Sequence, residues 1–123
     1  MTPIVAIGVM RLDDWRQGRR FQAHAARALE TAKQAEGCLF ADAIQHGELY
    51  YSLSHWRDEA AMQAYVSDEG HARAMRGLVR YGASLGFLKY EAAQTPDWEE
   101  ALARWRASER EVINRQDPAH GRL

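Results

Sequence analysis

The chain has 123 residues and a mass of 14.0 kDa, which is the size of one domain. Sixteen Lys and Arg residues against seventeen Asp and Glu residues give a formal net charge of −1, which argues against a general nucleic-acid-binding protein. The single Cys38 cannot form an internal disulfide, the apolar run 3–10 is too short to span a bilayer, and no secretory signal is visible, so we expect a cytoplasmic protein without a membrane segment.

Residues 3–12 are rich in β-branched side chains and predict a strand. Both faces of this strand are apolar: one carries Ile4, Ala6, Gly8 and Met10, and the other carries Val5, Ile7 and Val9. A strand with two apolar faces is typical of the centre of a sheet that is covered on both sides.

A helix is predicted next, from about residue 14 to residue 36. Asp14 offers an N-cap and has the spacing of a capping box with Gln17, and Gly37 suits the position after the helix end. One face of this helix is apolar and carries Phe21, Ala25, Ala28, Ala32 and Ala35.

Residues 38–46 and 48–56 alternate in polarity and are joined by a short turn, which predicts an antiparallel hairpin. In the second of these strands one face carries Leu49, Tyr51, Leu53 and His55, and the other carries Tyr50, Ser52, Ser54 and Trp56. Alternation alone does not say which of the two faces meets the helices.

Two short helices follow, the first capped by Asp58 and ending near residue 67, and the second capped by Asp68 and spanning about 69–81. In the second helix one face carries His71, Met75, Leu78 and Gly82.

We expect residues 82–86 to break the chain and residues 85–93 to form a fourth strand. A last helix is predicted to begin with Pro96 at its first position and to end at Asp117-Pro118. The apolar stripe of this helix consists of Trp98, Leu102, Trp105 and Val112.

The order βαββαβ followed by a helix predicts a ferredoxin-like α+β fold. Residues 1–95 form its domain, and residues 96–123 are a helical extension of the same domain. Helices on one side of the sheet would leave the other apolar side bare, which predicts a homodimer in which two sheets pack face to face. The alternative is that the C-terminal helix covers that side within one chain.

The segments GCLFADAI and LYYSLSHWRDEAAMQAYVSDEGHARAM resemble the antibiotic biosynthesis monooxygenase family of dimeric α+β barrels, over about residues 3–93. The matching positions are Trp56, Asp58, Glu59, Tyr65, Ser67 and His71. This resemblance implies a homodimer with a pocket between sheet and helices in each subunit. Members include cofactor-free oxygenases of quinol-like aromatic polyketides, haem-degrading enzymes, isomerases and members of unknown role, so the fold alone does not specify a reaction.

The chain departs from the haem-degrading members of that family. Those members have a Trp ten residues before an axial His, where this chain has Tyr65 and Met75, and they carry an Asn in the first strand, which is absent here. Haem binding or degradation is therefore a third and minor hypothesis.

His71 is the predicted catalytic residue. An imidazole titrates near neutral pH and can deprotonate a phenol or stabilise an anion. The structural alternative is a histidine that hydrogen-bonds to its own helix cap, Asp68.

The predicted substrate-binding residues are Trp56, Tyr65, Met75 and Tyr50. Aromatic and Met side chains around one imidazole suit a flat apolar ligand, although such clusters are more often core. The histidine spacing contains no metal-binding motif, and Cys38 is interpreted as a small buried hydrophobe.

Two functions from different classes follow. The first is a small monooxygenase that acts on a quinol-like aromatic compound without metal, flavin or other cofactor. The second is a non-catalytic dimer that binds a small apolar or aromatic ligand, for example a stress-related protein.

Overall fold

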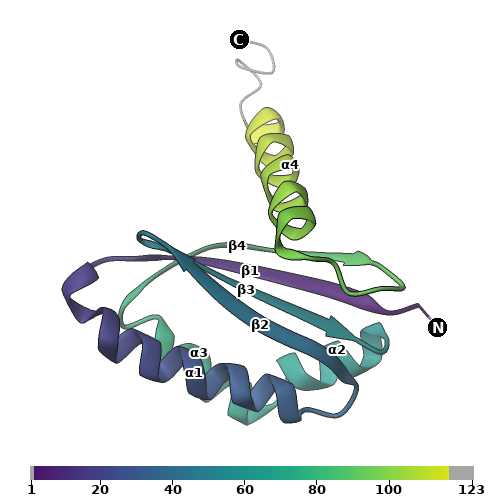
Figure 1. The fold of residues 1–123 in the computed structure, drawn as a ribbon, viewed down its shortest axis with the longest axis horizontal. Coiled ribbons are helices and arrows are strands. Elements are labelled where there is room, and N and C mark those ends of the chain that lie inside the picture. Colours follow the sequence, from purple (N-terminus) through teal and green to yellow (C-terminus); the bar gives the residue numbers. More distant parts are fainter. Residues whose placement is uncertain (1, 117–123) are drawn as a thin grey trace.

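The computed structural model describes residues 2–116, with only the backbone described for Trp15 and for residues 110–116. Its elements, in chain order, are β1 (Ile4–Leu12), the 3₁₀ turn η1 (Trp15–Gln17), α1 (Gly18–Gln34), β2 (Cys38–His46), β3 (Leu49–Trp56), α2 (Glu59–Val66), α3 (Glu69–Leu78), β4 (Gly82–Glu91) and α4 (Trp98–Gln116). The strands form one antiparallel sheet in the order β2-β3-β1-β4 (Figure 1). The ferredoxin-like α+β prediction is confirmed.

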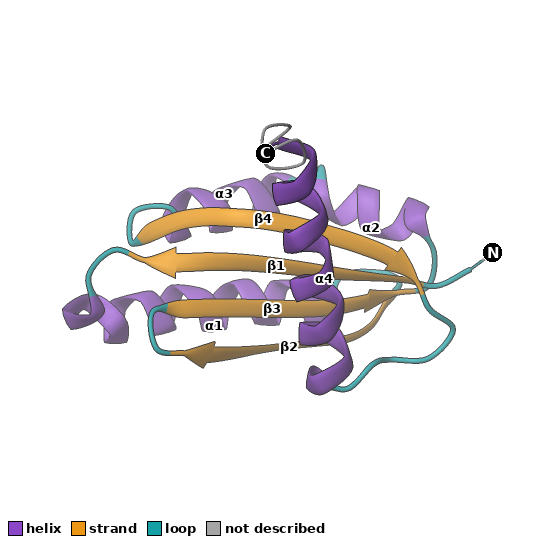
Figure 2. Cartoon of the chain, turned by 90° about the horizontal axis from the view of Figure 1, so that it is seen from above, coloured by secondary structure: helices purple, strands orange, loops and turns teal. Residues whose placement is uncertain are grey.

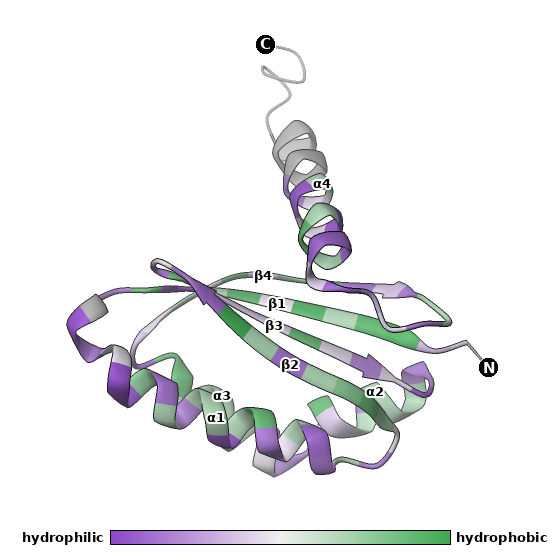
Figure 3. Ribbon diagram, in the orientation of Figure 1, coloured by the Kyte–Doolittle hydropathy of each residue, from purple (hydrophilic) through white to green (hydrophobic). Residues whose placement is uncertain are grey.

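The sheet separates two layers of helices. Helices α1, α2 and α3 lie on one side, and α4 crosses the strands on the other side (Figures 1 and 2). The central strand β1 is hydrophobic along most of its length (Figure 3) and is covered on both faces, as its sequence predicted. Val5, Ile7 and Val9 pack toward α4, whereas Ile4, Ala6 and Met10 pack toward the other three helices.

Helix α4 docks on the sheet through Ala101, Leu102 and Trp105, which are all buried. At its first residue, Trp98 donates a hydrogen bond of 2.9 Å from Nε1 to Asp42 Oδ2 on β2. The expectation of a bare outer sheet face is therefore wrong for this chain, because α4 packs across that face within one copy (Figure 2). The later part of α4 leads away from the sheet (Figure 1).

The predicted caps of the two short helices are confirmed. Asp58 accepts the backbone N–H of Ala61 at 2.8 Å, and Asp68 accepts that of Gly70 at 2.8 Å. The predicted cap at Asp14 is wrong, because the turn η1 intervenes and α1 begins only at Gly18. The Asp14 carboxylate instead binds the Arg16 backbone and guanidinium.

The predicted break at residues 82–86 is also wrong, because this segment is the first half of β4. Gly82 pairs with Leu12, and a Cβ at Gly82 would lie only 2.1 Å from the Arg11 carbonyl oxygen. The glycine therefore permits close strand pairing rather than ending a strand. The register between β1 and β4 shifts after Val9, which marks a β-bulge.

Helix α4 begins at Trp98 rather than at Pro96, which is buried just before it. Asp97 accepts the backbone N–H of Glu100 at 2.8 Å and so occupies the capping position. The stripe residue Val112 lies beyond the described side chains. None of the described helices combines the length and apolar character that crossing a bilayer requires.

Candidate functional site

A pocket of about 360 Å³ lies between the sheet and helices α1, α2 and α3, and its lining is mostly apolar. Its floor is the helix-facing side of the sheet, where small residues face each other across the strands. Ala6 pairs with Ser54, and Gly8 pairs with Ser52. At Gly8 even a Cβ would lie 3.0 Å from Ser52 Oγ, and none of these four residues carries a bulky side chain. Space therefore remains above the centre of the sheet.

Larger side chains close the ends of the pocket and the helices cover it. Met10 and Tyr50 stand at one end of the floor, and Trp56 stands at the other end. The helices contribute Ala28, Leu29 and Ala32 from α1, Met62, Tyr65 and Val66 from α2, and His71, Ala74, Met75 and Leu78 from α3. The result is a hollow suited to a flat ligand with one or a few polar groups.

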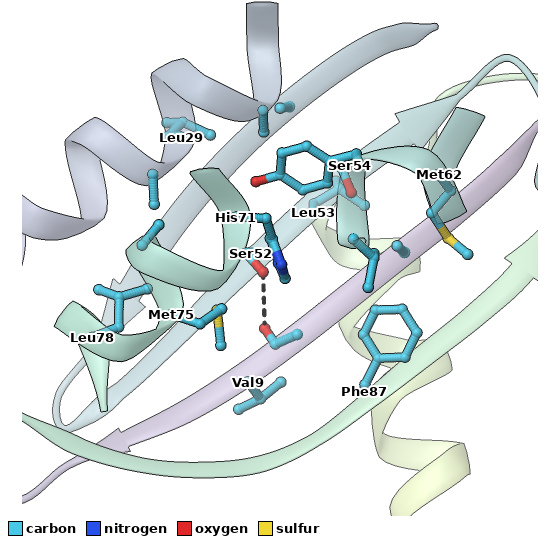
Figure 4. Close-up of a pocket in the computed structure, with 18 of the residues that line it drawn as sticks. Val9, Leu29, Ser52, Leu53, Ser54, Met62, His71, Met75, Leu78 and Phe87 are labelled. Atoms are coloured by element: carbon cyan, nitrogen blue, oxygen red, sulfur yellow. Dashed lines mark hydrogen bonds between the residues drawn. The ribbon is translucent and has the colours of Figure 1, made fainter. Parts of the chain in front are cut away.

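His71 projects from α3 into this hollow (Figure 4). Its half-buried ring meets the ring of Tyr65 edge-on, with centroids 4.8 Å apart. Desolvation lowers the pKa of His71 below its usual value, and this effect outweighs the opposing influences of the Val66 carbonyl and Asp68. A lowered pKa keeps the imidazole neutral near pH 7, so it can accept a proton.

The alternative role for His71, a hydrogen bond to its own helix cap Asp68, is not present in the structure. The Asp68 carboxylate accepts the Gly70 N–H, and no hydrogen bond joins it to His71 among the described residues. His71 therefore does not serve as part of its own helix cap.

Trp56 and Tyr65 form a stacked pair, with ring centroids 4.9 Å apart and an interplanar angle of 28°. Trp56 is 1% exposed, and its Nε1 donates to Ser54 Oγ at 2.8 Å. The indole is therefore a rigid wall of the pocket whose own hydrogen bond is already made. Tyr65, which lies between Trp56 and His71, has its pKa raised mainly by burial, so its hydroxyl stays protonated and can donate a hydrogen bond.

Tyr50 packs edge-on against Phe21 of α1 at a centroid distance of 4.9 Å. Burial, with a smaller contribution from Asp42, raises the pKa of Tyr50 to about 12. Tyr50 is therefore a neutral phenol at any physiological pH. Together with the half-buried Met75, it completes the set: the structure brings all five predicted site residues to one pocket, although their roles remain predictions.

The other described histidines, which are His24, His46 and His55, do not line the pocket. His24 packs against Tyr81 between α1 and α3, and His46 is exposed beside Tyr51. His55 is buried on the opposite sheet face, where Nε2 donates to the Ala92 carbonyl at 2.7 Å and Nδ1 lies 2.7 Å from Thr95 Oγ1. His120 lies outside the described residues. Among the side chains that the structure describes, no three metal-ligating groups gather at one place.

Among the lining residues that the sequence analysis did not single out are Ser52, Ser54, Phe87 and Lys89. The two serines were placed on the same strand face as Tyr50 and Trp56, but alternation left open which face meets the helices. The small size of their neighbours Ala6 and Gly8 was the available signal. The two β4 residues were missed because this strand carries large apolar side chains on both faces, Phe87 on one and Leu88 and Tyr90 on the other, so its pattern does not show which face meets the helices.

Comparison with known proteins places this geometry in a family. A family model described as antibiotic biosynthesis monooxygenase matches residues 3–77, which is more than half of the chain. A comparison with curated proteins gave no match.

Solved structures support the same fold. SnoaB, a cofactor-independent oxygenase from Streptomyces nogalater, is 15% identical with a TM-score of 0.68, over 79% of this chain and 100% of SnoaB. A conserved protein from Methanosarcina mazei is 16% identical with a TM-score of 0.66, over 73% and 92% of the two chains. A protein from Pseudomonas aeruginosa is 19% identical with a TM-score of 0.60, over 78% and 97%. At these identities the likeness concerns the fold alone. The family model, in contrast, matches more than half of the sequence, so the chain belongs to the antibiotic biosynthesis monooxygenase family.

Proposed function

We propose that this protein is a monooxygenase of a quinol-like aromatic compound and that it uses neither a metal nor a bound flavin. One observation carries the proposal: a single half-buried imidazole, that of His71, faces an aromatic-walled and mostly apolar pocket of about 360 Å³. The proposal also draws on the likeness to SnoaB, whose description as a cofactor-independent oxygenase belongs to that protein.

In the proposed reaction, His71 removes a proton from the substrate and gives a resonance-stabilised anion. The anion passes one electron to O₂, and the resulting substrate radical and superoxide combine to form a C–O bond. The protonated imidazole returns its proton to the peroxide. Loss of water then converts the substrate CH₂ group to C=O, so that one oxygen atom of O₂ enters the product and the other leaves as water.

The pocket residues have separable roles in this scheme. Tyr65 and Tyr50 are neutral phenols, so each can donate a hydrogen bond to an oxygen that gains negative charge. Trp56 and Met75 shape the apolar space that holds the ring. The apolar lining removes water from the anion, which strengthens its interactions with these donors.

Oxygen uptake tests the proposal. The purified protein is given anthrone, which has a CH₂ group between two aromatic rings, and oxygen consumption is followed with an electrode above the uncatalysed rate. We expect turnover by the parent protein and a loss of about 10²-fold or more in His71→Ala, the usual range for removal of a general base. His46→Ala, which removes an exposed histidine outside the pocket, is the matched control. Equal rates in His71→Ala and the parent would refute the role of His71.

The second candidate function is ligand binding without turnover, and the same largely apolar pocket favours it. A thermal-shift screen of small aromatic compounds separates the two functions. Stabilisation by a compound without oxygen uptake indicates a binder, whereas uptake indicates the oxygenase. A Soret band that saturates on titration with haemin would revive the third hypothesis, haem binding.

We further propose that two copies form a homodimer through the outer sheet face and α4. Phe40 of β2 and Leu85 of β4 are 39% and 37% exposed, and the later part of α4 leads away from its own sheet (Figure 1). Sedimentation equilibrium tests this: a single-chain mass at high concentration would contradict it.

A further inference from the structure

The mouth of the pocket lies along β4 and α2. Phe87 of β4 is 58% exposed, and Val66 at the end of α2 is 40% exposed, yet both line the pocket. Two large apolar side chains at the rim of an apolar hollow form an entrance that attracts an apolar ring.

A single ammonium group stands at this entrance. Lys89 lies two residues beyond Phe87, opposite Ala6 of the pocket floor, and is the one Lys or Arg among the described residues that line the pocket. Its Nζ forms an ion pair with Glu59 in the first turn of α2. This pair places the ammonium group on the helix side of the sheet, independently of strand alternation.

The ion pair between Lys89 and Glu59 is exchangeable. The two side chains are 44% and 51% exposed, and ion pairs this open to water contribute little to stability. An anionic group on a ligand could therefore take the place of Glu59 at small cost, while Glu59 returns to water. Glu91, the next residue on the same strand face, does not line the pocket.

We propose that Lys89 makes the pocket selective for aromatic acids: the ring lies over the small residues of the floor and the anionic group binds the Lys89 ammonium at the mouth. This deepens the proposed function by naming its substrate class. Only the oxidation of the bound ring rests on that function, whereas the binding of the acid does not. Glu59 acts as an internal competitor for Lys89. Removing it strengthens the binding of acids, and removing Lys89 weakens it.

Binding of an isosteric pair of probes tests the proposal. The affinities of 2-naphthoate and 2-naphthamide, which differ in charge but hardly in shape, are measured by isothermal titration calorimetry at pH 8. We expect the parent protein to bind the acid roughly three- to tenfold more tightly than the amide, a modest factor because the mouth is partly solvated. Lys89→Met should remove that preference, and Glu59→Gln should increase it, while the affinity for the amide stays the same in both.

Matched controls come from a second exposed ion pair, between Arg76 and Glu69 on α3, whose residues do not line the pocket. Arg76→Met and Glu69→Gln change the net charge equally and should leave the preference for the acid intact. If these controls shift the preference as much as the Lys89 and Glu59 variants do, the effect is one of overall charge and the proposal is wrong. Equal affinity for acid and amide, or no binding of either by the parent protein, would also overturn it.

Oxygen uptake separates this inference from the proposed oxygenase. A charge preference that depends on Lys89, without turnover of any aromatic substrate, would support the binding site and refute the oxygenase. Turnover that depends on His71, without a charge preference, would do the reverse.

Discussion

Removing the Trp105 side chain should release α4 from the sheet. Trp105 is 6% exposed and lies in a cluster with the β1 and β3 residues of the outer face. Its ring also contacts Gly86 so closely that a Cβ there would lie 2.9 Å from Trp105 Cη2. Trp-to-Ala substitutions at buried sites cost about 3–5 kcal/mol, so Trp105→Ala should remove a large part of the roughly 5–15 kcal/mol that stabilises a domain.

The assay is urea unfolding and thermal unfolding, each monitored by far-UV circular dichroism at low and at high protein concentration. For a chain of this length, a loss of about 3–5 kcal/mol corresponds to a fall in Tm of roughly 10–20 °C. Arg106→Ala, an exposed change one residue along the helix, should stay within about 0.5 kcal/mol of the parent. Trp98→Phe, which removes the hydrogen bond to Asp42, should cost about 1 kcal/mol.

A loss below about 1 kcal/mol in Trp105→Ala at both concentrations would refute this reasoning. It would mean that α4 is not docked on its own sheet, and that residues 96–123 are not an integral part of the domain as proposed. A loss seen only at high concentration would instead mean that α4 packs on a second copy.

Three further outcomes are expected. Gly37→Ala should destabilise the protein by about 1–3 kcal/mol in urea unfolding, because φ is +84° and the new Cβ would lie 2.5 Å from Ala61 Cβ. Gly47→Ala should cost less, because φ is +61° there and no heavy atom outside the adjacent residues lies within 4 Å of the new Cβ. Because the pKa of His71 is lower in the folded than in the unfolded chain, its contribution to stability is complete above the unfolded value of about 6.5 and is lost as pH falls through the folded value. His71→Asn should flatten that decline in Tm measured across pH 7 to 4, and an unchanged slope would contradict the assignment. In an ultraviolet titration of the folded protein, Tyr50→Phe should remove one phenol that ionises near pH 12, and loss of a phenol that ionises near pH 10 would contradict the burial of Tyr50.

Local signals predicted those parts of the fold that local chemistry determines. The bounds of β2 came out as expected because glycines with positive φ, Gly37 and Gly47, stand just before and just after the strand. The caps at Asp58 and Asp68 were found for the same reason, since an N-cap needs only its own helix turn. The start of β4 depends instead on pairing with β1 far away in the chain, and no local pattern distinguishes a strand glycine such as Gly82 from a turn glycine.

Some residues of the candidate site could also be predicted from local sequence patterns, and others could not. Periods of two and of 3.6 residues place Tyr50 with Trp56 and His71 with Met75 on common faces, so their convergence could be anticipated. Lys89 could not, because Phe87 on one face of β4 and Leu88 and Tyr90 on the other are all large and apolar, so alternation alone does not say which face meets the helices. The distinction between the two faces of β3 also required the three-dimensional structure, because both faces are rich in aromatic residues.

The size of the floor residues explains why a pocket exists at all. A strand face that served only the core would carry large side chains along its whole length, since burying them stabilises the fold and voids destabilise it. The β1 face instead has Ile4 and Met10 at its ends and Ala6 and Gly8 at its centre, opposite Ser54 and Ser52. This arrangement gives up stabilisation at the one place where α1, α2 and α3 converge above the sheet. A ligand that fills the space should restore it, so a bound aromatic compound is expected to raise the stability of the whole domain as well as occupy the site of chemistry.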